Sequence, residues 1–169
     1  MRISATDYVA NQYVWPKLQR LLAENPELHI ELISDYGLLN IVAERFDIGV
    51  RLGDQIERDI IAVRITPDET LAIVGSLAYL KTRLAPKVPA DLPRHNCVNL
   101  RLPTKDVLMP WKLVKGNEHI DVKVRGQLVF NNSYQMLDAA LKGFGLAYLP
   151  NALAEPAVTA GRRKRPRRR

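Results

Sequence analysis

The sequence LVFNNSYQMLDAALKGFGLAYLP, residues 128–150, decides the fold of this chain. It predicts a strand, a helix and a second strand in close succession. The apolar run Leu128–Phe130 is typical of a buried parallel strand, and apolar residues recur at helical spacing from Met136 to Phe144. Gly143 suits a left-handed helix end, and Leu146–Leu149 is the next apolar run. This order is the building unit of an α/β fold.

Three polar residues, Asn131, Asn132 and Ser133, stand between the first strand and the helix. All three are preferred N-cap residues. A helix that begins at the carboxyl edge of a parallel sheet presents N–H groups and the positive end of its dipole, and α/β proteins bind small, often anionic, ligands there. Two interpretations are open: these residues only cap the helix, or they cap it and also face a ligand.

The first fifty residues repeat the same order of strands and helices. The pattern predicts strands at residues 2–5, 28–32 and 47–52, and helices at residues 9–23 and 38–46. Strands that alternate with helices indicate a parallel sheet with right-handed crossovers. Pro16 lies inside the first helix, so the helix is either kinked there or begins its regular part there.

The middle of the chain predicts more strands and one further helix. Strands are expected at residues 60–65, 71–74 and 97–102, and a helix at residues 76–84 with Ser76 as its N-cap. The segments Trp111–Val114 and His119–Val124 are typical of a β-hairpin around residues 115–117. The fold class is therefore α/β throughout.

The net charge of +7 belongs to the end of the chain. Residues 162–169 read RRKRPRRR and hold seven of the 25 basic residues, so 18 remain against 18 acidic residues. The body of the protein is neutral, which argues against a nucleic-acid-binding surface on the fold itself. The sequence also has no signal peptide and no transmembrane run, so we expect a cytoplasmic protein with no membrane partner.

Catalytic and metal-binding signatures are absent from the sequence. Cys97 is the only cysteine, which excludes an intrachain disulfide, and its place at the start of an apolar strand predicts a buried, inert thiol. The three histidines, His29, His95 and His119, are scattered, without other ligand types at metal-binding spacing. We therefore expect no catalytic residue, no metal and no cofactor.

Six segments in order carry a resemblance to a known family. They are residues 3–32 (ISATDYVANQYVWPKLQRLLAENPELHIEL), 41–53 (IVAERFDIGVRLG), 60–65 (IIAVRI), 74–80 (VGSLAYL), 99–103 (NLRLP) and 126–150 (GQLVFNNSYQMLDAALKGFGLAYLP). Together they resemble the effector-binding domain of LysR-type transcriptional regulators over residues 1–155. No single segment is diagnostic, but their order and spacing are specific.

The resemblance implies a two-lobed fold like that of type 2 periplasmic binding proteins, truncated at its C-terminus. Residues 1–74 would form the first α/β lobe and residues 75–155 the second, with a small-molecule effector in the cleft between them. The effector would contact polar side chains at strand ends, namely Ser4, Thr6, Asp7, Ser34, Asp35, Asn99, Arg101, Asn131, Asn132 and Ser133. Arg101 either pairs with a ligand carboxylate or is an ordinary strand-edge charge. Arg51 is expected to be structural.

The sequence departs from the family pattern at both ends. No winged helix-turn-helix precedes the domain, so DNA would be contacted only through a part absent here. The family's second crossover and last strand are replaced by residues 156–169, which we expect to form a basic, disordered tail. We favour a frameshift or a fragment boundary as its origin. The rival explanation is a basic arm that binds nucleic acid.

Three hypotheses about function remain at this point. The leading one is an effector-sensing and oligomerising module of a LysR-type regulator, which binds a small molecule, with an anionic or strongly polar one favoured, and forms a homo-oligomer in the full-length family. The second is a free-standing solute-binding protein of the same fold, which the missing signal peptide disfavours. The third is a small α/β enzyme, which the absent catalytic signatures disfavour.

Overall fold

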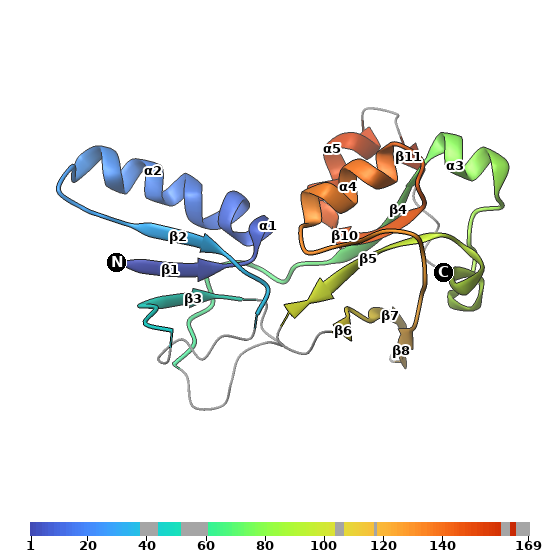
Figure 1. Cartoon of the computed structure of the whole chain (residues 1–169), viewed down its shortest axis with the longest axis horizontal. Coiled ribbons are helices and arrows are strands. Elements are labelled where there is room, and N and C mark those ends of the chain that lie inside the picture. The colour runs from blue at the N-terminus through green and yellow to red at the C-terminus, as the bar shows by residue number, and fades with distance from the viewer. Residues whose placement is uncertain (38–43, 52–60, 104–106, 117, 160–162, 165–169) are drawn as a thin grey trace. The chain divides into compact units, whose positions relative to one another are not determined.

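The computed structural model describes residues 1–37, 44–51, 61–103, 107–116, 118–159 and 163–164 (Figure 1). The chain divides into two compact units. The first comprises residues 1–67 and 103–105, and the second residues 68–102 and 106–169. Each unit has its own sheet.

The first unit is built on a three-stranded parallel sheet. Strand β1 (Arg2–Ala5) lies between β2 (Glu31–Ser34) and β3 (Ile48–Val50). Ala5 is in register with Ser34 on one side and with Val50 on the other. The carboxyl ends of all three strands therefore meet at one edge, as the sequence pattern predicts.

The helix between β1 and β2 lies along one face of this sheet (Figure 1). It begins as α1 (Asp7–Val9), widens into the π-helical segment η1 (Ala10–Val14) and continues as α2 (Trp15–Glu24). Pro16 stands in the first turn of α2. Because proline has no backbone N–H, it is tolerated where a regular helix begins, so the second of the two interpretations of Pro16 is correct.

Three predicted elements of the first unit differ from the structure. The strand expected at residues 28–32 lies at Glu31–Ser34, because the turn that follows α2 extends to Leu28, whose N–H donates to the Asn25 carbonyl at 3.1 Å. In the helix expected at 38–46, residues 38–43 lie outside the described residues, 44–45 form a turn and Phe46 is irregular. Residues 61–65 form no strand: the side chain of Ile61 is 94% exposed, and apolar alternation without a sheet to join does not make a strand.

The second unit contains a mixed sheet in the order β11-β4-β10-β5-β6, with β9 beside β5. Its strands are β4 (Leu71–Ser76), β5 (Cys97–Leu102), β6 (Val107–Leu108), β9 (Val129–Phe130), β10 (Leu146–Pro150) and β11 (Arg163–Lys164). Strands β10 and β9 both run parallel to β5, whereas β4 is antiparallel to β10. The stretch at residues 128–150 thus forms the predicted strand, helix and strand.

Helices cover one face of this sheet and a hairpin covers the other (Figure 1). On the helical face lie α4 (Ser133–Leu141) and α5 (Asn151–Thr159). The opposite side holds the 3₁₀ helix η3 (Pro89–Arg94) and the hairpin β7 (Trp111–Lys115) and β8 (Glu118–Val122). Helix α3 (Leu77–Thr82) lies beyond the end of β4, and its Tyr79 joins the core under the hairpin. The buried indole of Trp111 stacks on Tyr148, with ring centroids 5.6 Å apart, and closes the core beneath the hairpin.

The end of the chain differs from the expected disordered tail at residues 156–169. Helix α5 continues through Thr159, and Arg163–Lys164 pair antiparallel with Gly75 and Ser76 of β4. Without this segment β4 would be an edge strand with unpaired backbone groups, which an extended segment can satisfy whatever its side chains are. Residues 160–162 and 165–169 lie outside the described residues.

Candidate functional site

Polar residues follow each of the three strands of the first unit at their common carboxyl edge. Thr6 and Asp7 come after β1, Asp35 follows β2, and Arg51 follows β3. The parallel register that aligns Ala5 with Ser34 and Val50 brings these residues to the same edge. Ser34 lies at this edge too, but its side chain is exposed.

Arg51 and Ser4 form the centre of this edge. Ser4 is completely buried within β1, and its Oγ accepts a hydrogen bond from Arg51 Nη2 at 2.8 Å. The same guanidinium donates to the carbonyl of Val50 at 3.0 Å and to that of Gly37 at 3.4 Å. All three acceptors are neutral, and among the described residues no carboxylate forms an ion pair with Arg51. Burial lowers the pKa of this half-buried arginine and the nearby charge of Asp35 raises it, but a guanidinium remains protonated at neutral pH.

Two carboxylates complete the edge. Asp7 is buried and accepts a hydrogen bond from the hydroxyl of Tyr36. Asp35 is half-buried; its carboxylate accepts from the N–H of Gly37 at 2.8 Å, and its own N–H donates to the carbonyl of Ala5 at 2.8 Å. Thr6 is buried and precedes α1, but its side chain makes no cap hydrogen bond, so its hydroxyl is not needed to start the helix.

In the second unit, Asn131, Asn132 and Ser133 connect β9 to α4. Asn132 is the N-cap: its side-chain oxygen accepts from the N–H of Gln135 at 3.0 Å. Asn131 is exposed, and Ser133 is the buried first residue of α4. The predicted cap is thus confirmed and belongs to Asn132. That these residues also face a ligand remains a prediction.

Strand β5 carries the other two candidates, Asn99 and Arg101. Asn99 is 1% exposed; its side-chain N–H₂ donates to the carbonyl of Cys97, and its Oδ1 has no hydrogen-bond partner within the described residues. By strand alternation Asn99 shares the sheet face of Cys97, which packs in the core beneath the hairpin, so it does not lie on the face that α4 covers. Arg101 is exposed, opposite Leu108 of β6.

Two further residues of the first-unit edge, Arg51 and Tyr36, are not among the candidates from the sequence. The sequence predicts a structural Arg51, and its hydrogen bonds to Ser4 and two carbonyls agree with that role. A signal was present: Arg51 stands directly after an apolar strand, where a parallel sheet collects its strand ends. Tyr36 gave no comparable signal, because its role depends on the distant Asp7, 29 residues earlier in the chain.

The described residues contain neither a group of metal ligands nor an activated cysteine nucleophile. No group of three His, Cys, Asp or Glu side chains among them could hold a metal ion. Burial raises the pKa of the Cys97 thiol to about 12, so the reactive thiolate is not formed at neutral pH. None of the described helices is both long enough and apolar enough to span a membrane.

Comparison with known protein families shows to which family this domain belongs. The model of the LysR substrate binding domain matches residues 1–168. The chain belongs to this family. The match extends beyond residues 1–155, where the resemblance was expected to end, and includes most of the basic tail.

Curated relatives agree with this assignment to the LysR family. A protein of Pseudomonas aeruginosa named as a putative transcriptional regulator is 41% identical over 162 residues, which cover 96% of this chain and 53% of the relative. The HTH-type transcriptional regulator PgrR of Escherichia coli is 41% identical over 158 residues, covering 94% and 53%. The chain thus spans about half the length of these relatives.

Solved LysR-type structures share the fold. The regulatory domain of AphB from Vibrio vulnificus superposes with a TM-score of 0.80 at 22% identity, covering 98% of this chain and 81% of that one. CrgA of Neisseria meningitidis, a LysR-type transcriptional regulator, gives a TM-score of 0.77 at 17% identity, covering 98% and 55%. The expected two-lobed, periplasmic-binding-protein-like fold is therefore confirmed.

Proposed function

We propose that this chain is the effector-sensing domain of a transcriptional regulator and that its effector is a small anionic or strongly polar molecule. The regulators it resembles are about twice its length, and one of them is named an HTH-type regulator. In this proposal the domain binds the effector, and the regulator contacts DNA through a part that the match does not cover. Homo-oligomerisation and a cytoplasmic location belong to the same proposal, because the relatives are transcriptional regulators.

The observation that carries the proposal is the bonding of Arg51. Its described partners are a hydroxyl and two carbonyls, so its positive charge lacks an ion-paired carboxylate among the described residues. A half-buried charge is stabilised when an anion approaches, because water screens the attraction less there than at an open surface. An effector with a carboxylate or a similar group would supply that anion at the carboxyl edge of the first unit.

Thr6 and the start of α4 are the other expected contacts. The buried hydroxyl of Thr6 is not used as a helix cap, so it is suited to a ligand hydrogen bond. In the second unit, α4 begins at Ser133 behind the Asn132 cap, and the positive end of its dipole favours negative charge. The start of α4 is therefore a second candidate contact, argued within the second unit alone.

The proposed action is a change in conformational equilibrium rather than a chemical reaction. An effector that binds one conformation of the regulator more tightly than another shifts the population toward it, and the DNA-binding part follows. The regulator names of the relatives point away from an enzyme. The proposal accordingly assigns these residues binding roles, with no catalytic step.

Calorimetric titration of defined variants tests the proposal. A panel of small carboxylates is first screened for compounds that raise the melting temperature of the chain, since a ligand of the folded state stabilises it. The strongest compound is then titrated into the parent, Thr6→Ala and Arg51→Lys. Loss of a ligand hydrogen bond should weaken binding roughly tenfold to a hundredfold in Thr6→Ala. Arg51→Lys should also weaken it, because lysine cannot reproduce the planar fork of arginine.

A matched control is Thr66→Ala. Thr66 is in the same unit, but its hydroxyl donates only to the adjacent carbonyl of Pro67, at 2.9 Å, so its removal should leave affinity unchanged. Equal affinity of the parent, Thr6→Ala and Arg51→Lys would show that these side chains do not touch the effector. The edge assignment would then be wrong.

A further inference from the structure

A polar cavity lies at the edge of the second unit's sheet where strands β5, β9 and β10 begin. It has a volume of about 440 Å³ and is lined by Tyr79, Thr82, Arg83, Asn96, Gln127, Gly143 and Phe144. Asn96, Gln127 and Phe144 precede β5, β9 and β10, so the cavity is at the amino ends of these strands. The candidate residues Asn131–Ser133 follow the carboxyl end of β9. The cavity is thus separate from the strand-end site.

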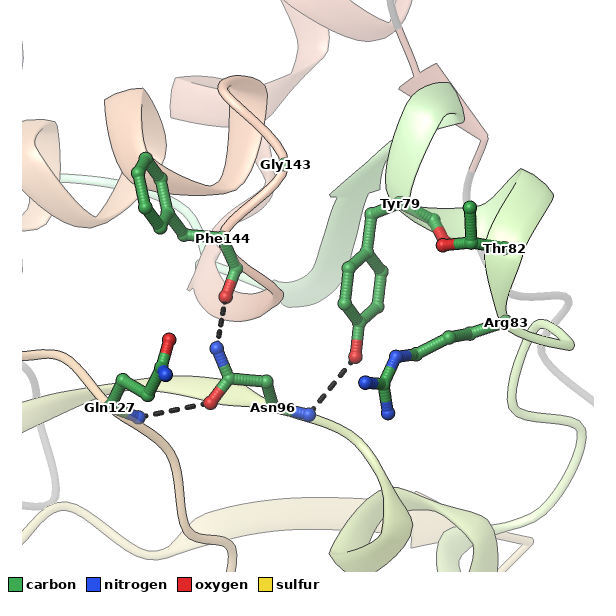
Figure 2. Close-up of a pocket in the computed structure, with 7 residues that line it drawn as sticks. All are labelled: Tyr79, Thr82, Arg83, Asn96, Gln127, Gly143 and Phe144. Carbon is green, nitrogen blue, oxygen red and sulfur yellow. Dashed lines mark hydrogen bonds between the residues drawn. The ribbon is translucent and has the colours of Figure 1, made fainter.

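Asn96 forms a fixed floor for the cavity (Figure 2). Its side chain donates to the carbonyl of Phe144 and accepts from the N–H of Gln127 at 2.9 Å. Its backbone N–H donates to the hydroxyl of Tyr79 at 3.0 Å, and its carbonyl accepts from the N–H of Leu146 at 2.9 Å. Three separate segments are therefore tied together at one residue, so the cavity exists before any ligand arrives.

Glycines allow this close approach. A Cβ at Gly126 would overlap the backbone of Cys97, and a Cβ at Gly145 would overlap the carbonyl of Asn96. Gly145 also has a φ of +143°, which side-chain-bearing residues rarely adopt. Backbone packing at these two glycines therefore fixes the segments that carry the lining residues Asn96, Gln127 and Phe144.

Two exposed residues at the cavity, Arg83 and Gln127, have polar side chains with no hydrogen-bond or ion-pair partner among the described residues, although Arg83 lies 5.8 Å from the centroid of the Tyr79 ring. Figure 2 shows them on opposite sides of Asn96, with Arg83 beside the Tyr79 hydroxyl and Gln127 beside Phe144. Both are thus available to a molecule lying over Asn96.

The charges around the cavity favour an anion. Arg83 is the only charged residue among the described lining residues, which include no carboxylate. Burial and then the charge of Arg83 lower the pKa of the adjacent His95, which is hydrogen-bonded to the Tyr79 hydroxyl at 3.1 Å, and this favours its neutral form. Arg83 therefore keeps an attraction for an external carboxylate.

The apolar part of the cavity indicates what the carboxylate is attached to. Phe144 is a large apolar residue that remains 50% exposed, with its ring pointing away from Tyr79, and the largely buried Tyr79 also lines the cavity. An aromatic body would cover this surface, while polar groups at its two ends met Arg83 and Gln127. We propose that this cavity binds a small aromatic acid, with its carboxylate on Arg83 and a hydroxyl or similar group on Gln127.

The test uses the 169-residue chain and two probes, 4-hydroxyphenylacetate and its neutral amide, 4-hydroxyphenylacetamide. Binding is followed by the backbone amide NMR signals of Asn96, Gln127 and Phe144. We expect the acid to bind about tenfold more tightly than the amide, because only the acid makes a charge-assisted hydrogen bond to Arg83. In Arg83→Gln this preference should disappear. In Gln127→Ala both probes should bind several-fold more weakly while the preference remains.

Lys81→Gln is the matched control, because Lys81 is an exposed cation of the same helix that does not line the cavity. It should retain the full preference for the acid, as should Thr6→Ala, which alters only the strand-end site. The absence of saturable shifts at these three amides overturns the proposal. So does an acid preference that persists in Arg83→Gln or is lost in Thr6→Ala. The last result would place the acid at the strand-end site and leave that proposal standing.

Discussion

Two arginines stand at opposite ends of the same three-stranded sheet and are bonded in different ways. Arg2, at the amino end of β1, pairs with the carboxylate of Glu31 at 2.7 Å, donates to the carbonyl of Glu44 at 2.9 Å and lies 4.7 Å from the ring of Phe46. Arg51, at the carboxyl end of β3, has the hydroxyl of Ser4 and two carbonyls. Arg2 has its counter-charge within the described chain, whereas Arg51 is neutralised by none of its described partners. This difference in bonding is the basis on which we propose the carboxyl end, and not the amino end, as the effector site.

Asn96 and Asn99, just before and within strand β5 of the second unit, also differ in how completely their polar groups are hydrogen-bonded. Asn96, just before β5, uses both side-chain groups and both backbone groups in hydrogen bonds. Asn99, three residues later, keeps a buried oxygen without a partner among the described residues. A polar group with complete bonding stabilises the fold, whereas a buried group with incomplete bonding lowers stability unless something else completes it.

Among the variants that test this contrast, Asn96→Ala is expected to have the largest effect on the free energy of unfolding. It should lower the free energy of unfolding by about 2–4 kcal/mol, because it leaves the N–H of Gln127 and the carbonyl of Phe144 without their partner. Asn99→Leu should change it by less than about 1 kcal/mol, since it removes an unpaired polar atom together with one hydrogen bond. Urea denaturation of both variants measures the difference. Equal losses would break the contrast.

The next largest effect on stability is expected from replacing the two arginines, Arg51 and Arg2. Arg51→Met should destabilise the protein by about 1–3 kcal/mol, because the buried Ser4 hydroxyl and two carbonyls lose their donor. Arg2→Met should have a smaller effect that decreases as salt is added, since the exposed pair with Glu31 is screened. Denaturation at low and high salt distinguishes them. A strong salt dependence in the Arg51 variant would contradict the assignment of neutral partners.

Asn132→Ala should cost about 1 kcal/mol, because the N–H of Gln135 loses its cap. The exposed neighbour Asn131 is the matched control, and Asn131→Ala should leave the melting temperature nearly unchanged. Thermal unfolding followed by circular dichroism is sufficient to compare the two. If both variants melted at the same reduced temperature, the cap would not be confined to Asn132.

The smallest effect is a change in acid stability at Asp91. Two hydrogen bonds, from the N–H groups of Lys87 and Val88, lower the pKa of this exposed carboxyl below its ordinary value of 3.8. A depressed folded-state pKa contributes stability above the ordinary value and loses it as the pH falls through the folded pKa. Asp91→Asn should therefore flatten the loss of stability below about pH 4. Asp121→Asn, on the exposed face of the hairpin, is the control that should retain the parent's slope.

Much of this architecture could be predicted because it rests on local patterns. Apolar runs and N-cap residues located β1, β5, β10, α3 and α4, and the cap bonds of Ser76 and Asn132 match the predicted helix starts. The segment at residues 61–65 could not be resolved this way, because alternation shows only that a strand could form. The antiparallel direction of β4 and the pairing of β11 depend on neighbours far away in sequence.

The candidate site could be predicted only in part for the same reason. Polar residues at strand ends are visible in the sequence, and the structure brings Ser4, Asp35 and Arg51 to one edge. Which of them interact is not visible, because the bond between Arg51 and Ser4 joins residues 47 apart. Asn99 lies on the sheet face that the hairpin covers, and not on the face that α4 covers. The local sequence shows neither the bond between Arg51 and Ser4 nor which element covers which face of the sheet.

The π-helical segment Ala10–Val14 affects how insertions and deletions can alter such a domain during evolution. A π turn holds one more residue than an α turn, so removing one residue there would restore an ordinary helix. Leu18 could keep α2 packed on the sheet, while Thr6 and Asp7 would rotate by about 100° around the helix axis. The length of this turn, and not only the identity of its side chains, therefore determines which polar groups the edge presents. An insertion or deletion could change ligand preference here without substituting a single contact residue.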